Sequence, residues 1–235
     1  MWYNTKKKGD CVIREKSKGL LIVVSGPSGA GKGTICKRII EDMKDTKVSI
    51  SMTSRAPRGK EVNGVDYYFV NKEEFEERIV NDEFLEYAVV HNNQYYGTPK
   101  AKIEEDLSKG KNVILEIDIQ GALKVKEKVS EALFIFIMPP SMEELKSRLI
   151  KRNTETKDKI LERFKTAYNE INEYAKYNYV VVNDKVDKAV DKVKSIITAE
   201  KCRVDRIEEI YLNTKEEFIH EGLIDEEFEN KELEI

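Results

Sequence analysis

Four apolar runs recur through the middle of the chain, and charged stretches separate them. The runs are LLIVVS (20–25), VILEIDIQ (113–120), LFIFIMPP (133–140) and YVVVND (179–184). Short runs of this kind are typical of strands that are buried on both faces of a sheet, and the stretches between them suit helices. The alternation predicts an α/β fold in which crossover helices flank a parallel sheet.

Two long segments do not follow this alternation. Residues 51–100 are polar, aromatic and rich in turn-forming residues, and residues 143–173 form a helical pattern loaded with Arg and Lys. The ends differ in charge, since residues 1–19 carry six basic and two acidic groups and residues 200–235 carry five basic and thirteen acidic groups. We therefore expect a basic N-terminal extension (1–19), a core domain with two inserts (20–201) and an acidic C-terminal extension (202–235).

Composition narrows the class of protein. The chain is 40% hydrophobic and 36% charged, and none of its apolar runs approaches the ~20 residues of a membrane span. The first residues lack the apolar region of a secretory signal. Cys11, Cys36 and Cys202 are too few and too far apart for a disulfide framework or a metal site. We therefore expect a cytoplasmic protein that does not bind membranes. Because the segment between the basic and acidic ends has a net charge of only about +1, we expect no nucleic-acid partner either.

The stretch GPSGAGKGT (26–34) follows the first apolar run directly and precedes the amphipathic ICKRIIEDM. In a phosphate loop, G-x-x-x-x-G-K-[ST], backbone N–H groups hold phosphates, the Lys reaches the outer ones and the hydroxyl residue meets Mg²⁺. Gly26, Gly31 and Lys32 fit this pattern, but Gly33 stands at the hydroxyl position and Thr34 follows one residue later. A Gly-rich turn with a solvated lysine is the alternative, and the flanking strand and helix favour the phosphate loop.

A second cationic group lies in SMTSRAPRGKEVNGVDYYFV (51–70). Arg55 and Arg58 flank Pro57, and Tyr67 follows the turn signal Asn63–Gly64. Two arginines and a tyrosine can hold a second phosphate through charge-assisted hydrogen bonds. Surface charge on a loop is the alternative. Beside a phosphate loop, we favour a second phosphate.

Several spaced motifs resemble the guanylate kinase family in content and in order. They are SRAPRGKEVNGVDYYFV, EFLEYA (83–88), QYYGTP (94–99), ILEIDIQGA (114–122) and the arginines of the following helical segment. The resemblance runs from about residue 20 to residue 201 and covers neither the first residues nor the acidic tail. It implies a P-loop NTPase-type parallel sheet flanked by helices, with an inserted GMP-binding subdomain (51–100) and a helical lid (143–173).

The resemblance also implies an activity, namely transfer of the γ-phosphoryl group of ATP to GMP in purine nucleotide metabolism, with Mg²⁺ as cofactor. It assigns the GMP phosphate and the guanine with its sugar to separate groups of residues. The phosphate group is Arg55, Arg58, Tyr67 and Tyr96, and the guanine group is Ser51, Glu86, Thr98 and Asp118.

The ATP side follows in the same way. The resemblance places the loop around the ATP phosphates, with Asn183 near adenine and three lid arginines closing over the site. The loop residues are Ser28, Gly29, Ala30, Gly31, Lys32, Gly33 and Thr34, and the arginines are Arg148, Arg152 and Arg163. Lys32, Arg55 and the lid arginines would then be catalytic, because phosphoryl transfer spreads negative charge that cations stabilise.

The residue chemistry agrees with these roles. Guanine offers adjacent N1–H and N2–H donors that one carboxylate can accept together, whereas adenine has a lone pair at N1, so Glu86 would select guanine. Glu116 and Asp118 have the i, i+2 spacing that puts both carboxylates on one face of a strand. They could merely pair with Lys32 and nearby arginines, but we favour contacts to guanine from Asp118 and to Mg²⁺ or its waters from either acid.

Two rival functions remain open from the sequence. A scaffold-type binding module could keep this fold without catalysis, although Lys32 and the arginines are all present. A kinase for a different nucleotide is the other rival, and Glu86 argues against adenine. The sequence leaves the oligomeric state undecided, and a homo-oligomer is compatible with it.

Overall fold

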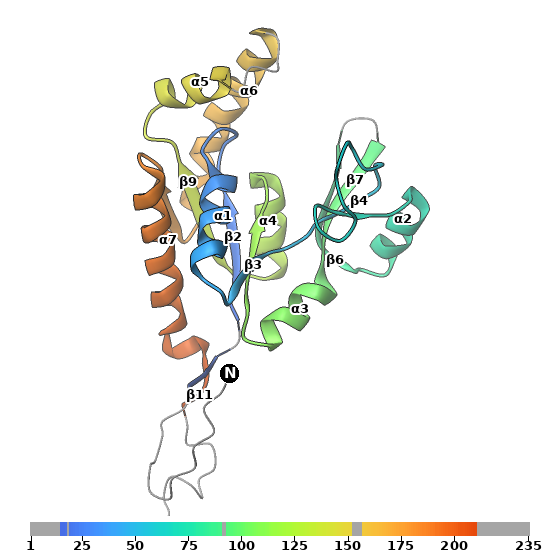
Figure 1. Ribbon diagram of the computed structural model, residues 1–235, viewed down its shortest axis with the longest axis vertical. Coiled ribbons are helices and arrows are strands. Elements are labelled where there is room, and N and C mark those ends of the chain that lie inside the picture. The colour runs from blue at the N-terminus through green and yellow to red at the C-terminus, as the bar shows by residue number, and fades with distance from the viewer. Residues whose placement is uncertain (1–14, 18, 91–92, 152–156, 211–235) are drawn as a thin grey trace, which may run out of the picture. The chain divides into compact units, whose positions relative to one another are not determined.

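The computed structural model describes residues 15–17, 19–90, 93–151 and 157–210 (Figure 1). The chain divides into two compact units, one of which spans Gly19–Glu200. The other contains the two ends of the chain. In that second unit β1 (Glu15–Ser17) pairs antiparallel with β11 (Ile207–Ile210), which follows the short 3₁₀ helix η3 (Val204–Arg206).

The larger unit is built on a five-stranded sheet in which every pair of neighbours is parallel. Its strand order is β10-β9-β2-β8-β3. The α/β fold with a parallel sheet is confirmed, and all four apolar runs supply a strand. The bounds are β2 (Leu21–Ser25), β3 (Thr46–Val48), β8 (Asn112–Glu116), β9 (Leu133–Met138) and β10 (Tyr179–Val182).

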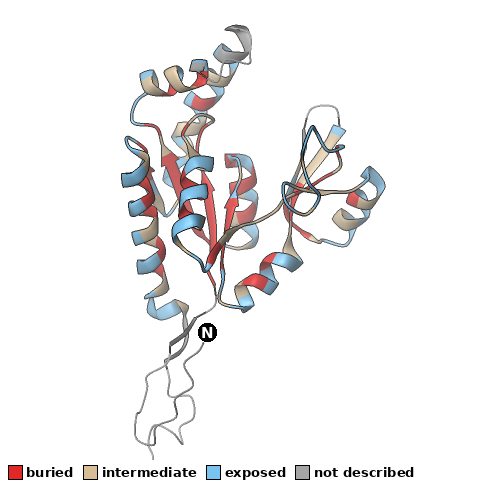
Figure 2. Cartoon of the chain, viewed as in Figure 1, coloured by how far each residue is buried: buried red, intermediate tan, exposed pale blue. Residues whose placement is uncertain are grey.

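Helices cover both faces of this sheet because successive strand residues point to opposite faces. In β2, Ile22 and Val24 pack into one buried cluster and Leu21 and Val23 into another. The first cluster includes residues of α1 (Lys32–Asp42) and α7 (Val186–Lys201), and the second includes residues of α3 (Lys100–Ser108) and α4 (Ile119–Lys128). Figure 2 shows the sheet as the most completely buried part of this unit.

The segment at 51–100 forms a second sheet with the order β5-β4-β7-β6. Its own small core joins Phe75, Phe84 and Met52, and the rings of Phe75 and Phe84 stack with their centroids 4.4 Å apart. The elements are β4 (Met52–Thr53), β5 (Tyr68–Phe69), α2 (Lys72–Val80), β6 (Phe84–Val90) and β7 (Gln94–Pro99).

The segment at 143–173 is helical, as the sequence predicts. It comprises α5 (Met142–Lys151), α6 (Lys157–Ile171) and the 3₁₀ helix η2 (Asn172–Lys176). Leu145, Leu149 and Ala167 form a separate buried cluster between the two α-helices. Within the described ranges, none of the helices has the length and apolar character that crossing a bilayer requires.

Candidate active site

The Gly-rich loop connects the carboxyl end of β2 with the N-terminus of α1, as the sequence predicts. Gly26 has φ 143° and Gly31 has φ 95°, a region that side chains rarely adopt. A Cβ on Gly26 would lie 2.3 Å from the carbonyl oxygen of Ile137, and one on Gly31 would lie 2.4 Å from Asn183 Nδ2. The loop therefore needs glycine at both positions, and it exposes backbone N–H groups at the start of a helix.

Lys32 is the first residue of α1, and its side chain turns back toward the loop. Its Nζ donates hydrogen bonds to the carbonyl oxygens of Gly26 (2.6 Å) and Pro27 (3.3 Å). Burial lowers the pKa of Lys32, and the nearby carboxylates of Glu116, Glu170 and Asp118 act in the opposite direction. The ammonium group thus stands among three acids beside the place where the loop would hold phosphates.

Glu116 fills the space in front of Gly33. A Cβ at Gly33 would lie 3.3 Å and 3.5 Å from the two carboxylate oxygens of Glu116. A carboxylate therefore stands where the usual hydroxyl side chain of a phosphate loop would reach. Thr34, in the first turn of α1, is exposed.

Asp118 does not continue the strand as its i, i+2 spacing from Glu116 suggests. β8 ends at Glu116, and Asp118 is the N-cap of α4, where its Oδ1 accepts a hydrogen bond from the Gly121 N–H (2.7 Å). Both acids are exposed at this edge of the sheet. Their carboxylates are held by a strand end and a helix start, and neither is buried in an apolar surface.

Two lid arginines form hydrogen bonds with the phosphate loop, and one of them also bonds to Asn183. Arg148 donates from Nη2 to the carbonyl oxygen of Asn183 (3.1 Å) and from Nη1 to that of Ala30 (3.5 Å), and its Nε bonds to Glu144. Arg163 donates to the Oγ of Ser28. The structure thus brings both arginines to the loop. Arg152 lies outside the described residues.

Glu170 is an acid of this site that the sequence analysis missed. It lies two helical turns after Arg163 in α6, and its carboxylate accepts a hydrogen bond from the backbone N–H of Ser28. Burial raises its pKa, and Lys32 opposes that shift. The seven-residue spacing from Arg163, which puts both on one helix face, is the signal that could have identified it.

Asn183 is hydrogen-bonded to the phosphate loop. Its side chain is buried, and Nδ2 donates to the carbonyl oxygen of Ala30 (2.8 Å). Leu145 and Leu149 of α5 lie close to the loop at Gly29, where a Cβ would lie 3.0 Å from the first and 3.2 Å from the second. The contact of Asn183 with adenine stays a prediction.

The second cationic group centres on Arg55, which is buried. Its Nε donates to the hydroxyl of Tyr96 (2.9 Å), and its guanidinium carbon lies 4.9 Å from the centre of the Tyr67 ring. The rings of Tyr67 and Tyr96 meet edge to face at 5.9 Å. Arg58 is exposed on the same loop. Three of the four residues predicted to hold the second phosphate therefore touch one another.

Glu61 is a further member of this group, and it was not predicted from the sequence. Glu61 binds both terminal nitrogens of Arg55, at 2.6 Å and 2.8 Å. In the sequence Glu61 stands in the charged run RGKE, where a solvated side chain is the ordinary expectation.

Glu86 is largely buried on β6, with 9% of its surface exposed. The hydroxyl of Thr98 donates to Glu86 Oε1 (2.6 Å), and a Cβ on Gly121 would lie 3.4 Å from Oε2 and 3.3 Å from Asp118 Oδ1. Burial raises the pKa of Glu86, and the charge of Asp118 adds to that shift. The structure thus brings Glu86, Thr98 and Asp118 together. Ser51, just before β4, is half-buried.

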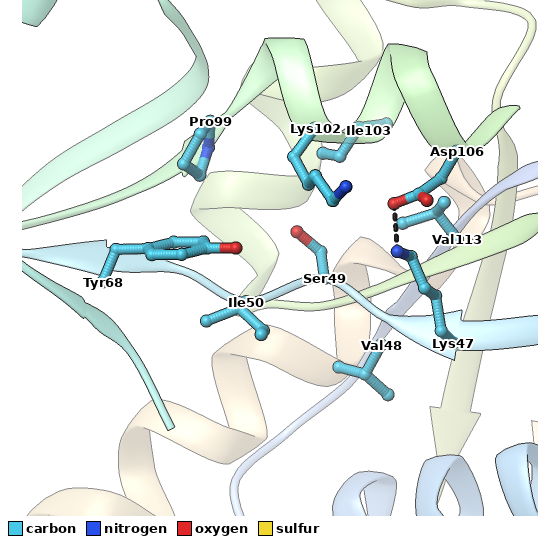
Figure 3. A pocket seen from close by; sticks show the side chains of 10 residues that line it. All are labelled: Lys47, Val48, Ser49, Ile50, Tyr68, Pro99, Lys102, Ile103, Asp106 and Val113. Carbon is cyan, nitrogen blue, oxygen red and sulfur yellow. Dashed lines mark ion pairs between the residues drawn. The ribbon is translucent and has the colours of Figure 1, made fainter. Parts of the chain in front are cut away.

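One small pocket of about 100 Å³ lies apart from these groups (Figure 3). Its walls include Ser49 and Ile50, between β3 and β4, and Pro99, the last residue of β7, which α3 follows directly. It therefore lies at both connections between the two sheets of this unit. Lys47 and Asp106 form an ion pair on its wall. None of the predicted site residues that the structure describes lines it.

Among the described residues, His, Cys, Asp and Glu side chains do not gather in groups of three or more that could hold a metal ion. Cys36 is buried in α1, and burial raises the pKa of its thiol. This favours a packing role for Cys36.

Comparison with known proteins identifies relatives of the whole unit. The guanylate kinase family profile matches residues 18–200. A guanylate kinase of Clostridium perfringens is 60% identical over 213 residues, which cover 91% of this chain and 98% of the relative. One of Clostridium tetani is 62% identical over 208 residues, covering 88% and 99%. The crystal structure of guanylate kinase from Anaplasma phagocytophilum superposes with a TM-score of 0.66 at 33% identity, covering 92% and 99%.

Proposed function

The chain belongs to the guanylate kinase family and transfers the γ-phosphoryl group of ATP to GMP, and from this premise we propose how its residues divide the work. The Gly-rich loop takes the ATP phosphates on its backbone N–H groups from Ser28 to Thr34, and Lys32 reaches the transferring group. The observation that carries this assignment is Lys32 itself. It opens α1 among three acids and donates to carbonyl oxygens that a phosphate can replace.

GMP binds on the second sheet. Arg55, Arg58, Tyr67 and Tyr96 hold its phosphate, and the contacts among three of them support this role. Ser51, Glu86, Thr98 and Asp118 hold guanine and its sugar.

Selection of guanine rests on Glu86. Its Oε1 already accepts from Thr98, and Oε2 lies beside Gly121 and Asp118, so this oxygen and the remaining lone pairs can accept from N1–H and N2–H. Adenine presents a lone pair at N1, which the carboxylate would repel. Burial raises the pKa of Glu86, which means that the protein around it does not fully compensate the buried carboxylate charge. The two N–H donors of guanine would compensate it.

Mg²⁺ is the divalent ion that we propose for ATP. Glu116 and Asp118 would hold it through its waters, because Glu116 occupies the place of the hydroxyl that Gly33 lacks. When bound, the ion neutralises charge on the phosphates. Thr34 contacts a phosphate in this arrangement.

The reaction needs no side chain to remove a proton. The attacking group is an oxygen of the GMP phosphate, which is largely ionised near neutral pH because phosphate monoesters have a second pKa of about 6. The chain therefore contributes position and positive charge. Arg148, Arg152 and Arg163 supply that charge from the lid, and the contacts of Arg148 and Arg163 with the loop support this role. We propose that the reaction takes place in the cytoplasm, where both nucleotides are made and used.

Replacement of Lys32 tests the assignment of the loop. Lys32→Ala should lower kcat by about 10²-fold or more, which is the usual effect of losing one preorganised electrostatic donor. Lys37→Ala is the matched control, because Lys37 is an exposed lysine of the same helix. The control should retain kcat within about twofold. A folded Lys32→Ala protein with unchanged kcat would remove Lys32 from the mechanism.

A further inference from the structure

Glu61 joins two of the residues that we assign to the GMP phosphate. Its Oε2 accepts from Arg55 Nη1 (2.6 Å) and from the backbone N–H of Arg58 (2.7 Å), and its Oε1 accepts from Arg55 Nη2 (2.8 Å). Its own backbone N–H donates to the carbonyl oxygen of Arg58 (3.1 Å). The carboxylate is thus tied both to the guanidinium and to the turn that carries it.

These bonds decide which donors of Arg55 are still available. A guanidinium group has five N–H donors. Nε donates to Tyr96, Nη1 donates to Glu61 and to the carbonyl oxygen of Ala56 (3.0 Å), and Nη2 donates once to Glu61. Within the described part of the chain, one N–H of Nη2 is left over. It lies on the edge of the guanidinium that also carries Nε.

The hydroxyl of Tyr96 lies at that same edge. Because it accepts from Arg55 Nε, its own proton is directed elsewhere and can be donated. The Tyr67 ring lies against the face of the guanidinium and limits its rotation. The open edge of Arg55 therefore offers one N–H and the neighbouring O–H of Tyr96 to an incoming anion.

We propose that Glu61 is a positioning residue for the acceptor nucleotide, which holds Arg55 so that its Nε–Nη2 edge and the Tyr96 hydroxyl face the GMP phosphate. The inference rests on the proposed role of Arg55 in holding that phosphate. The carboxylate stays ionised throughout the neutral range, because hydrogen bonds from Arg55 and from the Arg58 backbone lower the pKa of Glu61 to about 2.

A competing role for Glu61 predicts the opposite effect. A carboxylate that binds both terminal nitrogens of an arginine resembles a phosphate, so Glu61 could occupy the GMP site and be displaced by the nucleotide. Displacement would break two bonds to Arg55 and one to the Arg58 backbone. The attachment of Glu61 to its own turn therefore favours the positioning role.

The test compares GMP with guanosine, which carries the same base and sugar without the phosphate. In Glu61→Gln one accepting oxygen becomes an NH₂ group that faces a guanidinium N–H, so one of the two paired hydrogen bonds to Arg55 is lost. Titration calorimetry should show the GMP dissociation constant rising by about tenfold. The guanosine dissociation constant should change by less than about twofold. Steady-state assays should show a matching rise in the KM for GMP.

Glu74→Gln is the matched control. Glu74 accepts from Arg78 Nε (3.2 Å) and Nη2 (2.8 Å) on α2, which is part of the same insert, and belongs to neither group of GMP residues. This variant should bind GMP and guanosine as the wild-type protein does.

Three results would overturn the inference, one of which is an unchanged GMP dissociation constant in Glu61→Gln. Tighter GMP binding by Glu61→Gln would make Glu61 a competitor of the phosphate, and equal losses for GMP and guanosine would give it a general role in the structure of the insert. Arg55→Lys separates this inference from its premise. If Arg55→Lys weakens GMP alone while Glu61→Gln has no effect, only the positioning role fails. If Arg55→Lys leaves the difference between GMP and guanosine intact, the assignment of Arg55 fails as well.

Discussion

Replacement of Glu86 by Gln should reduce activity and increase stability at the same time. Thr98 can still donate to the remaining amide oxygen, and the new NH₂ group takes the place of an oxygen near Asp118, which can accept from it. The variant should therefore fold. The same NH₂ group would face the N–H donors of guanine in place of an acceptor.

The loss of activity follows from the hydrogen bonds involved. Hydrogen bonds to a charged group contribute about 1.5–3 kcal/mol, and about 1.4 kcal/mol corresponds to a factor of ten. Loss of one such bond, with a donor now facing a donor, should lower kcat/KM for GMP by at least about tenfold. The NH₂ group can donate to adenine N1, so discrimination against AMP should weaken. ATP binding without acceptor should not change.

The gain in stability follows from the raised pKa of Glu86, which results mainly from burial. A carboxyl group with a raised pKa favours the folded state while it is protonated, and this contribution is lost as pH rises through the folded-state pKa. At neutral pH wild-type Glu86 therefore opposes folding, whereas Gln does not ionise. Glu86→Gln should have the higher melting temperature at pH 7–8, and the difference should vanish as pH falls below the ordinary range of a Glu side chain.

Thermal unfolding across this pH range, together with coupled phosphotransfer assays on GMP and AMP, measures both effects. A melting temperature below that of the wild type at pH 7–8 would refute the argument from burial. Equal losses of activity on GMP and AMP would instead show that Glu86 supports the fold of the insert and does not read guanine.

Two further predictions concern the pocket and the loop. Lys47→Met should destabilise the protein by about 1–3 kcal/mol in denaturant titrations, because it leaves the Asp106 carboxylate, 4% exposed, without the ammonium group that it pairs with. Asp106→Asn should cost less, because Lys47 is 37% exposed and can reach water, and equal costs would contradict this account. Gly33→Ser should leave kcat within about threefold, because its side chain can donate to the exposed Glu116 carboxylate. Glu116→Gln alone should raise the Mg²⁺ concentration needed for half-maximal rate. In combination with Gly33→Ser the rise should be smaller, and an equal rise would show that Glu116 does not take the place of the missing hydroxyl.

Long apolar runs were the reliable signal for the fold. The runs that became β2, β8 and β9 are almost completely buried, and such strands need almost continuous apolar sequence. The run that became β10 forms an edge strand, in which only Val181 is buried. The strand β3 was missed because it is three residues long and only Thr46 in it is buried. The predicted end of β8 was wrong, since Asp118 begins the next helix by capping it.

The candidate site was predicted least well where a residue acts on its neighbours. Lys32 and Arg55 stand in motifs whose spacing carries meaning, so the sequence identifies them. Glu61 and Glu170 stand in charged surroundings that are typical of solvated side chains. Their importance depends on a turn that brings Glu61 back to Arg55 and on a helix that brings Glu170 to the phosphate loop. The spacing of Glu170 from Arg163 indicates only a shared helix face. The two contacts themselves cannot be read from local sequence, because one depends on the conformation of a turn and the other on the packing of a distant helix against the loop.

The most direct measurement of the central claim is coupled phosphotransfer by the purified protein with ATP and a panel of acceptors: GMP, AMP, UMP and dTMP. The account predicts turnover on GMP with kcat/KM at least about 10²-fold above that on AMP, because a carboxylate that accepts two donors of guanine meets a lone pair on adenine. Comparable rates on AMP, or saturable binding of GMP without turnover, would contradict it.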